Sequence, residues 1–167
     1  MTTRSRTRSI AALVFLGFVL SGCAPDDSAM ASCDQLIPRE IVADVLGSQD
    51  GKLVQLQTEE RSPVSPLVNK MITDGIACGG SDDGAEILGG AVMIGQLPMD
   101  ELQWMTIQAD FADGGHPATD GFGIPGWVDV PKDEDDLAGG PGFAWKEGVL
   151  YYAMSPLMLG LAPVFEP

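Results

Sequence analysis

The side chains that could perform hydrolysis are few in this sequence. Its single histidine, His116, lies in the run Gly-Gly-His-Pro at 114–117, which is typical of a loop. The nearest approach to the G-x-S-x-G motif of serine hydrolases is residues 79–83, centred on Ser81, where the closing glycine is missing. Patterns for a phosphate-binding loop, a dinucleotide site, a zinc protease or a C-x-x-C pair are absent. The sequence therefore predicts no catalytic site, and a hydrolase with an unrecognised site is the alternative.

The acidic residues are numerous but do not follow a metal-binding pattern. The densest run extends from Asp133 to Asp136. A calcium loop needs oxygen ligands at alternating positions around a glycine, with a closing acid. The run has no glycine before Gly139 and no closing acid at the right spacing. We predict a solvated acidic loop and no metal site, with a module that binds divalent cations as the alternative.

The segment 114–126 combines five glycines and two prolines with larger apolar side chains. It is longer than an ordinary connection, and long ordered loops often carry binding surfaces. His116, Phe122 and Trp127 are therefore candidate binding residues. The alternative is that Trp127 and Trp145 pack against a sheet.

Residues 1–22 have the composition of an export signal. Arg4, Arg6 and Arg8 precede an unbroken apolar run at 10–20, which is the order found in secretory signal peptides. As a helix, this run of eleven residues would rise only about 16 Å, too little for the ~30 Å hydrocarbon core of a bilayer. Because the arginines are not adjacent, the general secretory route is favoured over the twin-arginine route.

The residues Leu20-Ser21-Gly22-Cys23 resemble the bacterial lipobox, in which an aliphatic residue and two small residues precede a cysteine that takes a lipid. The resemblance implies cleavage before Cys23 and a diacylglycerol on its sulfur, with an N-acyl chain as a further addition. Two acyl chains hold a protein stably on a membrane. Residues 23–32 then form a small, polar, flexible tether and 33–167 a single domain. The alternative is a plain signal peptide with an incidental cysteine.

The part of the chain after residue 22 is strongly acidic. Without the three arginines of the leader, six basic residues face 24 acidic ones, a formal net charge of −18. Such a surface repels nucleic-acid phosphates and anionic lipid headgroups. The charge excludes nucleic acid as a partner and indicates a soluble exported domain.

Two cysteines remain when Cys23 is set aside. An even pair in an exported chain, here Cys33 and Cys78, predicts a disulfide. Free thiols and a metal pair are the alternatives, but zinc needs further ligands and His116 lies far along the chain.

The elements that would position these residues follow from periodicity and turn residues. We predict that helices and strands follow one another along the chain in the order αβαββαβββα. The predicted helices span residues 38–46, 65–74, 98–113 and 155–161. The strands to which we assign bounds span residues 52–57, 76–80, 86–95, 143–145 and 149–154. Pro38 suits a first helical position and Gly47 a helix end, and residues 146–148 suit a hairpin turn. This order without regular βαβ alternation predicts an α+β domain, with two to four helices packed on an antiparallel sheet.

The helix at 98–113 is predicted from the spacing of its apolar residues. Its residues Leu102, Met105, Ala109 and Ala112 share one face. The spacing therefore predicts helical character for this segment.

This layout resembles small actinobacterial cell-envelope lipoproteins of poorly characterised families. The shared features, besides the lipobox, are Cys-x-x-Leu at 33–36, a helix ending at 46–47, a strand cysteine at Cys78 and a Pro-Gly loop at 125–126. This chain has glycines at 79–80 where such families carry an aromatic residue. Some of these families resemble the Mog1/PsbP sandwich, so the resemblance implies helices on an antiparallel sheet. The families have no agreed catalytic residues, so none are carried over.

Export, the lipid anchor and the lack of a catalytic pattern together favour a non-catalytic module on the outer face of the cytoplasmic membrane. Its expected partners are the membrane, through the lipid on Cys23, and an envelope protein or a wall or lipid component. No cofactor other than this covalent lipid is expected.

Overall fold

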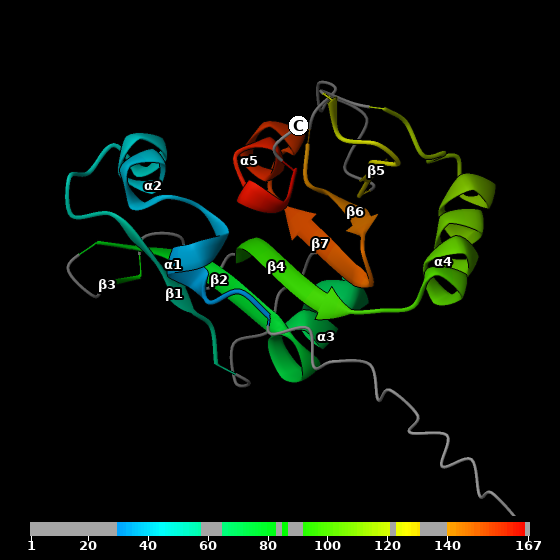
Figure 1. Ribbon diagram of the computed structural model, residues 1–167, viewed down its shortest axis with the longest axis horizontal. Coiled ribbons are helices and arrows are strands. Elements are labelled where there is room, and N and C mark those ends of the chain that lie inside the picture. The colour runs from blue at the N-terminus through cyan, green and yellow to red at the C-terminus, as the bar shows by residue number, and fades with distance from the viewer. Residues whose placement is uncertain are drawn as a thin grey trace, which may run out of the picture.

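An antiparallel sheet runs through the centre of the molecule (Figure 1). The structure is a computed structural model and describes residues 30–57, 65–82, 85–86, 92–120, 123–130 and 140–165. The strands are β1 (Lys52–Gln55), β2 (Ile76–Asp82), β3 (Ala85–Glu86), β4 (Val92–Pro98), β5 (Val128–Asp129), β6 (Gly142–Lys146) and β7 (Val149–Ala153). Their order across the sheet is β1-β2-β4-β7-β6-β5, β3 also pairs with β2, and every pair is antiparallel.

Helices cover both faces of this sheet. The helices α1 (Cys33–Leu36), α2 (Arg39–Leu46) and α5 (Pro156–Gly160) and the 3-10 helix η2 (Pro163–Phe165) pack on one face, and α3 (Pro66–Asp74) and α4 (Glu101–Asp113) pack on the other. The predicted α+β class is confirmed. The four-residue helix α1 is an addition to the predicted helices, because one turn is too short for periodicity to reveal it.

Strand β7 shows how the two faces are filled. Tyr151 and Ala153 point into the core on the α1–α2 side, and Leu150 and Tyr152 point into the core on the α3–α4 side. All four side chains are buried. Because successive side chains of a strand alternate between faces, a strand covered on both sides must be apolar throughout.

The predicted disulfide is confirmed. Cys33 of α1 is bonded to Cys78 of β2, with their Cα atoms 5.8 Å apart. Cys78 is fully buried, and Cys33 is 8% exposed. The bond therefore fixes the start of the described chain to a strand of the central sheet.

Several residues singled out from the sequence lie outside the described residues. These are Cys23, the predicted lipidation site, with the predicted leader at 1–22, and also Phe122 and the acidic run 133–136. In the described part of the chain, no helix is both long enough and apolar enough to cross a bilayer.

Candidate functional site

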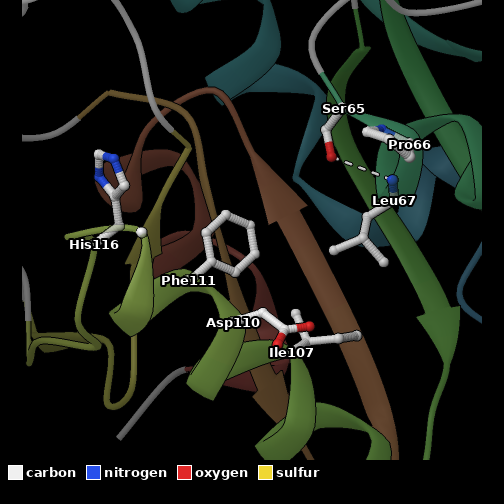
Figure 2. Close-up of a pocket in the computed structure, with 8 residues that line it drawn as sticks. Ser65, Pro66, Leu67, Ile107, Asp110, Phe111 and His116 are labelled. Carbon is white, nitrogen blue, oxygen red and sulfur yellow. Dashed lines mark hydrogen bonds between the residues drawn. The ribbon is translucent and has the colours of Figure 1, made fainter.

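A groove lies between the start of α3 and the end of α4, on one face of the sheet (Figure 2). Its volume is about 540 Å³, within the usual range of small-molecule sites. The lining residues are Ser65, Pro66, Leu67, Ile107, Asp110, Phe111, Gly114 and His116. Leu67, Ile107 and Phe111 make the floor of the groove apolar. Its polar side chains are those of Ser65, Asp110 and His116.

The end of α4 explains why His116 reaches this groove. The N–H of Gly115 donates to the carbonyl of Ala112 at 3.0 Å, and the N–H of His116 donates to the carbonyl of Phe111 at 2.9 Å. These two bonds form a Schellman motif, in which the residue after the left-handed glycine lies against the last turn of the helix. Gly115 has the required positive φ of 91°. The motif thereby places His116 beside Phe111.

The opposite wall is the first turn of α3. Ser65 is the N-cap, and its Oγ accepts a hydrogen bond from the N–H of Leu67 at 3.2 Å. Pro66 occupies the first helical position, where the missing N–H costs nothing. Leu67 is half-buried and completes the apolar wall. The sequence signal Ser-Pro that predicts this helix thus also forms one side of the groove.

The floor of the groove rests on the core. The ring of Phe111 lies 6.0 Å from that of Phe143 on β6, and Phe143 lies 5.4 Å from Tyr152 on β7, centroid to centroid. Phe143 and Tyr152 are buried. Because buried aromatic side chains have little room to move, the apolar floor is formed before any ligand arrives.

The polar groups of the groove do not form a catalytic dyad. Ser65, Asp110 and His116 are the residue types of a hydrolytic triad, but no hydrogen bond joins any two of them in the described structure. In Figure 2 the imidazole of His116 points away from Asp110. A nucleophile needs a base within hydrogen-bond reach. The three side chains therefore do not form an assembled triad in the described structure.

The serine named from the sequence lies elsewhere. Ser81 on β2 is 1% exposed, and its Oγ has no hydrogen-bond partner among the described residues. His116 adjoins Phe111, which packs on β6, and the strands β4 and β7 separate β2 from β6. At ~4.8 Å per strand, β2 and β6 are roughly 14 Å apart. The fold therefore does not bring Ser81 and His116 together.

The candidate loop residues divide between groove and core. His116 lines the groove, whereas Trp127 is 1% exposed and its Nε1 donates to Asp129 Oδ1 at 2.7 Å. Trp145 on β6 is half-buried, and its Nε1 donates a hydrogen bond to the carbonyl of Met99 at 2.7 Å. Both tryptophans pack against the sheet, as the alternative reading predicts. Sequence reasoning missed Phe111, whose only signal is its place one turn before the Gly-Gly that ends α4.

The buried tyrosines give the protein an alkaline limit of stability. Burial raises the pKa of Tyr152 to about 12, and burial together with the Glu147 carboxylate raises that of Tyr151. A raised pKa means that the folded protein keeps the phenolic proton longer than the unfolded chain does. Stability contributed by this proton is present below pH 10 and is lost as the pH rises towards 12.

We therefore expect Tyr152→Phe to flatten the pH dependence of the unfolding free energy in this window. One proton corresponds to a slope of up to about 1.4 kcal/mol per pH unit. Urea unfolding followed by tryptophan fluorescence at pH 8 to 12 measures it. An unchanged slope in Tyr152→Phe would show that other groups control alkaline unfolding.

Comparison of this chain with protein-family profiles, with curated proteins and with solved structures finds no match.

Proposed function

We propose that this protein is a lipoprotein of the cell envelope, anchored through Cys23, and that its domain binds a partner in the groove between α3 and α4. The observation that carries the binding role is the apolar floor of Leu67, Ile107 and Phe111. Single exposed apolar side chains are ordinary, but several that converge on one concave site are the usual sign of a ligand pocket. The anchor is supported by the leader and by the lipobox-like residues 20–23.

The chemistry of the rim favours an apolar segment that carries a positive charge. Asp110 is exposed at the rim, and its carboxylate forms no ion pair in the described structure. The groove has no basic lining residue and belongs to a part of the chain with a formal net charge of −18, so an anionic ligand would be disfavoured beside Asp110. A segment of another envelope protein that is apolar and carries a basic residue fits both the apolar floor and the Asp110 carboxylate. Its apolar side chains would lie on Phe111 and Leu67, and its cation would pair with Asp110.

A test of the groove uses Nile red, an uncharged apolar fluorophore, and a short amphipathic peptide of leucine and lysine. Leu67→Asp is expected to weaken the binding of Nile red roughly tenfold or more, because the new carboxylate loses solvation when the groove is filled. The peptide should lose less, because one of its lysines can pair with the new carboxylate. An acidic residue in the first turn of α3 is favourable to the helix. The variant should therefore fold as the parent does, which circular dichroism checks.

Leu102→Asp is the matched control. It makes the same chemical change on α4, where Leu102 is 74% exposed and outside the groove. Binding within about twofold of the parent is expected for this variant, because the substituted side chain stays in water. Equal weakening by both substitutions would contradict the groove as the binding site. Weakening by Leu102→Asp alone would place the site on the outer face of α4.

A further inference from the structure

A second, smaller pocket lies on the opposite face of the sheet, where α1, α2 and β1 meet. Its volume is about 180 Å³, and its lining residues are Cys33, Asp34, Ile37, Arg39, Val42, Lys52 and Leu53. This volume corresponds to about six water molecules. Two of the six basic residues that follow the leader, Arg39 and Lys52, thus meet at one small pocket.

Both basic side chains are available to a ligand. Arg39 and Lys52 are exposed, and neither side chain forms an ion pair or a hydrogen bond in the part of the chain that the structure describes. The one acid of the lining, Asp34, accepts a hydrogen bond from Ser32 Oγ at 2.5 Å. The lining therefore has a formal charge of +1, within a domain that is otherwise strongly acidic.

The pocket includes Cys33, which lies close in sequence to the predicted lipid anchor at Cys23. Gln96, only 2% exposed on β4, donates from its Nε2 to the carbonyl of Ala31. The disulfide fixes Cys33, which lines the pocket itself. Ala31 and Cys33 are thus both held on the sheet, and Cys33 lines the pocket together with Arg39 and Lys52. Eight residue steps separate Ala31 from Cys23, and covalent geometry limits such a span to about 29 Å.

We infer that this pocket binds a phosphate group, presented by a headgroup of the membrane that holds the anchor. Arginine and lysine are the side chains that proteins use for phosphate, arginine through its planar fork and lysine as a point charge. The bound phosphate accepts hydrogen bonds from the Arg39 guanidinium and the Lys52 ammonium. The membrane as the source rests on the proposed anchor at Cys23, whereas the recognition of phosphate does not.

The consequence is an orientation of the domain. Most of its surface is repelled by anionic headgroups, whereas a headgroup bound at Arg39 and Lys52 would hold the face with this pocket towards the membrane. Each basic residue near an anionic membrane surface contributes about 1 kcal/mol, which is about fivefold in affinity. The groove between α3 and α4 lies on the other face of the sheet and is left open to a partner.

The experiment follows backbone amide shifts by NMR in the mature, lipidated protein, held in micelles of an uncharged detergent without phosphate. One arm adds inorganic phosphate, a second adds phosphatidylglycerol, and a third adds a galactolipid that carries no phosphate. Phosphate and phosphatidylglycerol are expected to shift the amides of α1 and the first turn of α2, and the galactolipid is not. The phospholipid should act at the lower bulk concentration because the anchor raises its effective concentration at the pocket.

The variants Arg39→Gln and Lys52→Gln are each expected to weaken the affinity for phosphatidylglycerol, as measured from these shifts, about fivefold. Both variants should also weaken the affinity for inorganic phosphate. Lys70→Gln removes the same charge from an exposed site on α3 and should leave both affinities unchanged. Shifts with phosphate but none with phosphatidylglycerol would overturn the membrane as the source. Equal shifts with the galactolipid, equal effects of Lys70→Gln, or no shifts at all would overturn the phosphate site. The amides of Phe111 and His116 report on the groove in the same spectra. Failure of the groove as a binding site can therefore be distinguished from failure of the phosphate site.

Discussion

Removal of the Cys33–Cys78 disulfide is expected to lower the free energy of unfolding by about 4 kcal/mol. The bond closes a loop with a sequence separation of 45 residues, and cutting it returns that loop's conformational freedom to the unfolded chain. A domain of this kind has a total stability of about 5–15 kcal/mol, so the loss is a large fraction. Guanidinium unfolding of the double variant Cys33→Ala, Cys78→Ala against the oxidised parent measures the difference.

Reduction supplies the control for this variant. The parent treated with dithiothreitol should approach the stability of the double variant, and the variant itself should not respond to the reductant. Because Cys78 is fully buried, the alanine variant also loses packing and should be somewhat less stable than the reduced parent. A loss below about 1 kcal/mol in both cases would contradict the disulfide as a main constraint on the fold.

Replacement of Cys23 by alanine is expected to abolish lipid attachment completely. The thiol of Cys23 is the only group in the residues 20–23 that can form the thioether, so no neighbouring side chain can substitute for it. Cells that express the chain with an alkyne-tagged fatty acid should label the parent protein and leave Cys23→Ala unlabelled. The variant should also keep its leader, which mass spectrometry of the intact protein detects.

Ser21→Ala is the control for the anchor. It keeps a small side chain at the position before Gly22, so labelling and cleavage should proceed as in the parent. A labelled Cys23→Ala protein would place the lipid elsewhere in the chain. An unlabelled parent would show that residues 1–22 are a plain signal peptide or that the protein is not exported at all.

Much of the local structure could be predicted because its causes act within a few residues. Gly47 ends α2 with a φ of 67°, as expected for a residue without a Cβ. Ser65 and Pro66 begin α3, and the turn at 147–148 has the positive φ angles that a tight hairpin needs. Pro38 differs by one position, since it is the N-cap and the helix begins at Arg39.

Helix α4 shows where periodicity was insufficient. The face that Leu102 and Met105 share is exposed, at 74% and 58%, whereas Trp104 is 4% exposed. The helix has apolar residues on more than one side, so spacing alone does not decide which side is buried. Aromatic side chains remove more apolar area from water, and the face with Trp104 and Phe111 accordingly packs on the sheet.

The sequence by itself determined the end of α2, the start of α3, the hairpin turn, the disulfide partners and the α+β class, because each depends on local geometry or on counting. The start of α4 was predicted at residue 98, but Pro98 ends strand β4 and the helix begins at Glu101. Only the tertiary structure decided that β7 lies between β4 and β6, and that Ser65 and His116, distant in the chain, line one groove. It also decided that Arg39 and Lys52 meet beside Cys33. Such juxtapositions depend on which faces are buried together, and that is a property of the whole core rather than of any segment.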